Sequence, residues 1–136
     1  MPFKFEKLEV WKLSVEYIDL IYLLAEKLPR SEEFNLKSQI VRAATSIALN
    51  IAEGSNSQTD AEQARFLGLG IRSLVETVAC QHLIRRRNFG IENDQLDIVY
   101  QKAEMLAAKL HAMRKAIAPA QAWLREEKES YVTDEL

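Results

Sequence analysis

The sequence predicts an all-α fold: one antiparallel up-down-up-down four-helix bundle. Four segments carry apolar residues at helical spacing, proline and glycine fall almost entirely between them, and no segment alternates apolar and polar residues as a strand does. Long helices joined by short connections pack as bundles of this kind. We therefore expect residues 1–118 to form the bundle and residues 119–136 to form an extension with an acidic end.

The first two helices are placed by their end signals. Helix one is expected from Glu6 to Lys27, because Pro29 disfavours helical backbone at the residue before it. Residues 31–35 form a connection with room for one 3₁₀ turn. Helix two is expected from Leu36 to Glu53, closed by Gly54, since glycine takes the left-handed C′ conformation without a Cβ clash.

The third and fourth helices follow in the same way. Thr59 and Glu62 have the spacing of a capping box, and the third helix is expected to continue to Asn88 and to end at Gly90. The fourth helix begins near Asn93. Its apolar residues repeat on a strict heptad: Leu96, Val99, Ala103, Leu106, Leu110, Met113 and Ile117.

The first and third helices are more apolar than a single bundle requires. The apolar arc of helix one spans about 220°, whereas one core-facing stripe needs little more than about 100°. The arc of the third helix includes Leu67, Ile71, Val75 and Val78. Patches of that size rarely stay exposed on monomers, which favours self-association into a homo-oligomer. The alternative is that each helix lies deeply buried between two neighbours.

The amino-acid composition limits the classes of protein to which the chain can belong. Hydrophobic residues make up 48% and charged residues 28% of the chain, as is ordinary for a globular protein. The single cysteine, the lack of a signal-peptide h-region at the N-terminus and the lack of a long apolar run predict a cytoplasmic protein with no membrane partner. The net charge of −2 is weak support for nucleic-acid binding, which needs clustered cations.

Signatures of catalysis and of cofactor binding are missing. Neither His82 nor His111 follows a glutamate by three residues, as a di-iron bundle site requires. Cys80 is most simply a small buried apolar residue. Gly68 and Gly70 lie inside a helix, where they permit close packing and form no phosphate loop. We expect a protein that is not an enzyme, with no catalytic residues, no metal, no cofactor and no small-molecule substrate.

The second helix carries an unusual polar face. Projected at 100° per residue, five polar residues fall within an arc of about 80°: Gln39, Arg42, Ser46, Asn50 and Glu53. Solvated faces usually carry several lysines and glutamates, whereas short hydroxyls and amides suit fixed hydrogen bonds. The face is therefore either part of a core or interface, or a lightly charged surface.

A charged stripe on the third helix gives two further interpretations. Arg72 and Glu76 are spaced i, i+4 and can form a surface ion pair worth about 0.3–0.5 kcal/mol. Alternatively, Arg42, Glu53, Arg72 and Glu76 join in a polar network between helices or between subunits. We favour the network.

The one basic run is Arg85-Arg86-Arg87, at the end of the third helix. There it complements the negative end of the helix macrodipole, which is sufficient to explain it. Repeated by symmetry in an oligomer, the same triplet can form a ring that contacts RNA or DNA phosphates. The sequence leaves both interpretations open.

Several segments resemble one bacterial family. They are Phe5 to Lys12, Leu28-Pro29, Gln39 to Ala44, Ser46 to Gly54, Phe66-Leu67 and Ser73 to Glu76. Together they resemble the four-helix-bundle proteins encoded in intervening sequences of 23S ribosomal RNA genes, whose relatives include accessory proteins of diversity-generating retroelements. Two positions depart from the family pattern: Val41 precedes Arg42 where a second arginine is usual, and Arg72 precedes Ser73 where glycine is usual.

The resemblance implies an assembly and a partner. Relatives are ring-shaped homopentamers, and in the retroelement relatives the partner is a reverse transcriptase with its RNA. The expected function is therefore a non-enzymatic homo-oligomeric scaffold that binds RNA, DNA or a nucleic-acid-processing enzyme. The alternative is a purely protein–protein interaction module. The family motif includes residues matching Arg42, Glu53 and Glu76.

Overall fold

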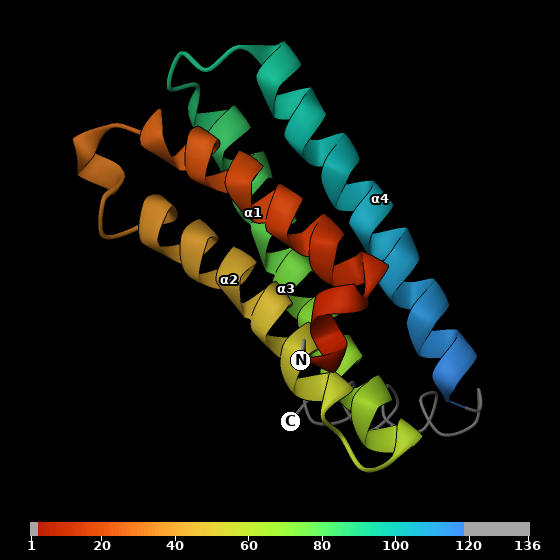
Figure 1. Cartoon of the computed structure of the whole chain (residues 1–136). Helices are drawn as coiled ribbons and strands as arrows, with labels where there is room; N and C mark the ends of the chain where they lie inside the picture. The colour runs from red at the N-terminus through yellow and green to blue at the C-terminus, as the bar shows by residue number, and fades with distance from the viewer. Residues whose placement is uncertain (1–2, 119–136) are drawn as a thin grey trace, which may run out of the picture.

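The structure, a computed structural model, describes residues 3–118 and confirms the all-α expectation for this part of the chain. The four long helices are α1 Glu9–Glu26, α2 Leu36–Ser55, α3 Asp60–Arg87 and α4 Asn93–Ile117 (Figure 1). Two short 3₁₀ helices, η1 Lys4–Lys7 and η2 Arg30–Glu32, precede α1 and α2. The expected extension at 119–136 lies outside the described residues.

The four helices pack side by side, with α1 and α3 each contacting both α2 and α4 (Figure 1). Ion pairs show the relative direction of α1 and α4. Glu9 on α1 pairs with Lys109 at 3.2 Å, and Glu16, further along α1, pairs with Lys102 at 2.7 Å. Residue numbers rise along one helix while they fall along the other, so the two helices run in opposite directions.

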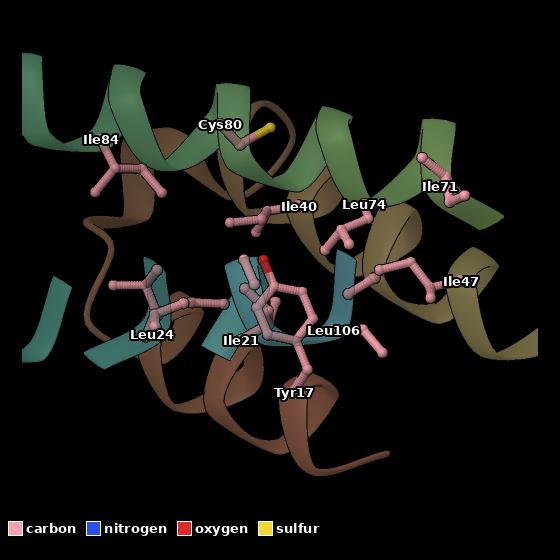
Figure 2. Close-up of a cluster of buried hydrophobic side chains, with 14 of the residues drawn as sticks. Tyr17, Ile21, Leu24, Ile40, Ile47, Ile71, Leu74, Cys80, Ile84 and Leu106 are labelled. Atoms are coloured by element: carbon pink, nitrogen blue, oxygen red, sulfur yellow. The ribbon is translucent and has the colours of Figure 1, made fainter. Parts of the chain in front are cut away.

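The core lies between all four helices. Figure 2 shows Tyr17, Ile21 and Leu24 extending from α1 toward the side chains of α3. The heptad expected on the fourth helix is the core face of α4, where its first five members are buried and Met113 and Ile117 are partly buried against the cluster. The apolar periodicity therefore identified the inner face of this helix correctly.

The predicted start of the first helix was wrong by three residues. Residues Lys4–Lys7 form the separate 3₁₀ turn η1, and Leu8 has extended backbone before α1 begins at Glu9. The carboxylate of Glu6 accepts a hydrogen bond from the Phe3 backbone N–H at 2.9 Å, which stabilises the short turn. A local side-chain interaction thus competes with extension of the helix.

The predicted role of Gly54 as a left-handed helix cap was also wrong. Helix α2 continues through Gly54 to Ser55. A Cβ atom at position 54 would lie 2.9 Å from the Cβ of Phe66, so the glycine allows α2 to approach α3 closely. Left-handed residues instead follow α3, where Asn88 has φ 54° and Gly90 has φ 82°.

The bundle leaves part of the apolar excess on its outer surface. On α1 the residues Val15, Tyr22 and Leu23 are 38–55% exposed, and on α3 Val75 and Leu83 are 61% and 52% exposed. Others of the apolar arc of α1, such as Leu13 and Leu20, pack partly against the core. None of the helices in the described range has an apolar stretch long enough to span a membrane.

Candidate functional site

The centre of the polar face of α2 packs against α3. Ser73 Oγ on α3 donates a hydrogen bond to Ser46 Oγ at 2.9 Å. Asn50 Nδ2 donates to the backbone oxygen of Ser46 at 2.9 Å and to its Oγ at 3.1 Å. All three side chains are half-buried. Ser46 and Ser73 therefore form a fixed polar contact between α2 and α3, and Asn50 holds Ser46 from within α2.

One ion pair extends this contact to the surface. Arg42 on α2 pairs with Glu76 on α3, with 3.3 Å between Nη2 and Oε1, and their side chains are 66% and 43% exposed. Pairs that are this accessible to solvent contribute about 0–1 kcal/mol to stability. The pair therefore contributes little to the fold of one chain.

The remaining members of the polar face and of the expected network lie apart. Gln39 Nε2 donates to Asn35 Oδ1 at 3.1 Å, at the start of its own helix. The side chains of Glu53 and Arg72 are exposed and form no ion pair or hydrogen bond with other residues in 3–118. The i, i+4 pair of Arg72 with Glu76 is absent from this range, because Glu76 is directed across to Arg42 on the neighbouring helix.

The sequence analysis missed a buried polar relay between α1 and α3. Gln81 Nε2 lies 2.6 Å from Tyr17 Oη, Tyr17 Oη lies 2.7 Å from Thr77 Oγ1, and Thr77 Oγ1 lies 2.6 Å from the Leu74 backbone oxygen. Tyr17 and Thr77 are fully buried and Gln81 is 5% exposed. We call Tyr17, Thr77 and Gln81 the buried relay.

The direction of the buried relay follows from its last acceptor. A carbonyl oxygen can only accept, so Thr77 donates to Leu74, and Tyr17 must then donate to Thr77. Tyr17 has no second hydrogen and therefore accepts from the amide nitrogen of Gln81. Gln81 Oε1 is left buried without a hydrogen-bond donor from residues 3–118.

Burial also changes the acidity of the relay. It raises the pKa of Tyr17 to about 12, more than the hydrogen bonds with Thr77 and Gln81 lower it. A sequence signal for the relay was available: Thr77 and Gln81 are polar residues at i, i+4 within the apolar stripe of α3, between Leu74 and Ile84.

The basic triplet lies where α3 ends. Arg85 donates to Asn93 Oδ1 at 3.2 Å and to Asp97 Oδ1 at 2.8 Å on α4. Arg86 and Arg87 are exposed and form no ion pair with other residues of the described range. One of the three charges is thus balanced by an aspartate, and two remain open to an external anion.

A hollow of about 220 Å³ lies beside Arg85, between α3 and the start of α4. It is lined by Gln81, His82, Arg85, Leu96, Asp97 and Tyr100. Two of these, Gln81 and Leu96, are buried and form its floor, while the others are exposed and form its rim. The rings of His82 and Tyr100 meet edge to face, with centroids 6.0 Å apart.

Metal-ligating and nucleophilic groups are sparse in the part of the chain that the structure describes. Residues 3–118 contain no cluster of three histidine, cysteine or acidic side chains that could hold a metal ion. Cys80 is buried within the core, where burial, and then the charge of Glu76, raises the pKa of its thiol. Its thiol is therefore protonated at neutral pH and packs as a small apolar group.

Comparison with known proteins places the chain in a family. Residues 6–112 match the family model described as 23S rRNA-intervening sequence protein. A crystal structure of a protein of unknown function from the S23 ribosomal protein family of Bacteroides thetaiotaomicron is similar, with a TM-score of 0.72 and 26% identity over 78% of this chain and 98% of that chain. No curated protein matches. The chain belongs to the 23S rRNA-intervening sequence protein family.

Proposed function

We propose that this protein is a non-enzymatic, ring-shaped homo-oligomeric scaffold that binds a nucleic acid or a nucleic-acid-processing partner through its Arg85–Arg87 triplets. The observation that carries the proposal is the position of the triplet: Arg86 and Arg87, which form no ion pair within residues 3–118, lie at one end of a bundle that also exposes apolar residues on α1 and α3. Association through those apolar residues repeats the triplet around a symmetry axis.

The apolar surface supports the assembly. Tyr22, Leu23 and Val75 are each at least 49% exposed, although burying such side chains stabilises a protein by about 1.5–3 kcal/mol each. A second copy of the chain can cover them. The pentamer as the leading stoichiometry comes from the family resemblance.

Light scattering of the full chain tests the assembly. Five copies of 15.6 kDa give an expected mass of about 78 kDa. Leu23→Glu and Val75→Glu should lower the mass, because each places a charge in a desolvated contact. Met105→Glu, at a 45% exposed position on α4, is the matched control. A single species near 15.6 kDa for the unaltered chain would refute the assembly.

Phosphate contacts should make nucleic-acid binding steeply salt-dependent and weakly sequence-dependent. Changing Arg85, Arg86 and Arg87 together to Gln should weaken binding of structured RNA and lower the magnitude of the salt slope by about 2–3 per protomer. The control changes Lys4, Lys7 and Lys12 to Gln, which alters the net charge equally at exposed positions on η1 and α1.

Two outcomes contradict this proposal in different ways. Unchanged affinity in the triple arginine variant excludes the triplet as the contact. No binding of RNA or DNA at low salt favours the alternative, a purely protein–protein interaction module.

A further inference from the structure

We propose that the hollow between α3 and α4 seats one unpaired base of a single-stranded nucleic acid, specifically a base with an exocyclic amino group. This inference rests on the proposed function and adds to it a base-binding pocket next to the phosphate-binding arginines. Each protomer would then bind a single strand through one of its bases as well as through its phosphates.

Gln81, one of the residues that line the hollow, carries a buried acceptor that lacks a donor. The buried relay directs the Gln81 amide nitrogen to Tyr17, so Oε1 is the free end of the amide, buried and without a donor from residues 3–118. An unmet buried acceptor is costly, and a ligand N–H that reaches Oε1 when the Gln81 side chain turns toward the hollow would remove that cost. The exocyclic amino groups of adenine, cytosine and guanine supply such a donor.

The rim of the hollow is suited to a flat, neutral group. Tyr100 is 37% exposed and lies beside His82, and nucleic-acid bases stack on such aromatic rings. The charges of Arg85 and Asp97 compensate each other at 2.8 Å. The rim is therefore near electrical neutrality, which disfavours a phosphate or carboxylate inside the hollow and leaves the Asp97 carboxylate as a second acceptor for amino donors.

The adjacent arginines place the phosphate outside the hollow. Arg86 follows His82 by four residues on α3, so both lie on the same face of the helix. A nucleotide whose base enters the hollow therefore has its phosphate close to Arg86, with Arg87 one residue further. Single-strand-binding proteins likewise combine aromatic side chains that stack on bases with cationic side chains that contact the phosphates.

The size of the hollow selects an unpaired base. Its 220 Å³ is below the range of about 300–1,000 Å³ for drug-sized ligands and accommodates one small planar ring system. Bases in a duplex are paired and stacked, so they cannot enter such a site without leaving the helix.

The test uses fluorescence anisotropy of the full chain with three short labelled single strands: oligoadenosine, oligouridine and an abasic strand with the same number of phosphates. We expect oligoadenosine to bind about 5-fold or more tightly than the abasic strand, the lower end of measured base–aromatic stacking. Oligouridine should lie between them, because uracil stacks but has no exocyclic amino group.

Two variants separate stacking from hydrogen bonding. Tyr100→Ala should abolish the preference for oligoadenosine over the abasic strand, while Tyr22→Ala, at an exposed tyrosine of α1, should leave it unchanged. Gln81→Met removes the acceptor and should abolish the preference for adenosine over uridine. Thermal melting of each variant shows whether it is folded, and Tyr100 is a surface residue, 37% exposed.

The outcomes distinguish this inference from the proposed function. Equal affinity of the unaltered protein for oligoadenosine and the abasic strand, with salt-dependent binding retained, overturns the base pocket and leaves the phosphate contact intact. An unchanged base preference in Tyr100→Ala also overturns the pocket. Failure of every strand to bind at low salt overturns both, and saturable binding of an aromatic peptide instead would assign the hollow to a protein partner.

Discussion

Two polar clusters join α3 to its neighbours, and they differ in depth. The buried relay connects α3 to α1 through neutral groups, with Tyr17 and Thr77 at 0% exposure. The Arg42–Glu76 pair connects α3 to α2 through charged groups that are 66% and 43% exposed. Buried hydrogen bonds cannot be exchanged for water without cost, whereas exposed charges remain solvated. We conclude that the buried relay fixes α1 against α3 more strongly than the exposed pair fixes α2 against α3.

The largest loss in free energy of unfolding is expected from Tyr17→Phe, in the buried relay. The change leaves the Gln81 amide nitrogen buried without an acceptor, at a cost of about 1–3 kcal/mol in the free energy of unfolding. Tyr22→Phe, at a 49% exposed tyrosine on the same helix, should change stability by less than about 0.5 kcal/mol. Urea melts at one fixed protein concentration measure both, since assembly contributes to stability. Equal effects of the two changes would contradict a structural role of the relay.

Alkaline pH should weaken the same relay. The folded pKa of Tyr17 is raised to about 12 from an ordinary 10.0, so the folded state holds its proton more tightly than the unfolded state. The resulting stability is present below pH 10 and is lost as the pH rises toward about 12, by roughly 1.4 kcal/mol per pH unit from this group. The difference in unfolding free energy between the unaltered protein and Tyr17→Phe, measured across this window, should shrink. A constant difference would argue against a buried titrating phenol.

Intermediate effects are expected at the half-buried serine contact between α2 and α3. Ser73→Ala removes one interhelical hydrogen bond and should cost about 0.5–1.5 kcal/mol. Asn50→Leu removes two bonds to Ser46 on its own helix and should cost a similar amount, reduced by the better helix propensity of leucine. Measured by chemical denaturation, the loss in free energy of unfolding of both variants should lie between that of Tyr17→Phe and that of Arg42→Gln. A cost above that of Tyr17→Phe would reverse the ranking by depth.

The smallest effects are expected at the exposed charges. Arg42→Gln should change stability by about 0–1 kcal/mol, less so in high salt, and Glu53→Ala by no more than about ±0.5 kcal/mol. A loss of well over 1 kcal/mol in either variant, seen only at concentrations where the protein is assembled, would place that charge in a contact between subunits.

Much of the fold was predictable from the sequence, since apolar periodicity and proline placement locate helices directly. The heptad from Leu96 to Ile117 identified the inner face of α4, and Thr59 was correctly expected to cap α3, where its Oγ1 accepts from the Glu62 backbone N–H at 3.1 Å. These features depend on residues within a few positions of one another, which a linear pattern contains.

The candidate site was predictable only in part. The projection of α2 correctly grouped Ser46 and Asn50, and the basic triplet correctly marked the end of α3. The projection of α2 also grouped Gln39 and Glu53 with these residues, although both lie on the surface. An arc of about 80° on one helix does not show which part of that arc a neighbouring helix covers.

What the sequence by itself determined is the number of helices, their approximate ends and the face that each turns inward, because these follow from spacing along one chain. Only the tertiary structure decided that Glu76 pairs with Arg42, that Gly54 allows contact with Phe66, and that Tyr17 meets Thr77 and Gln81. The physical reason is that these contacts join residues on different helices, so they depend on how the helices are aligned and how closely they pack.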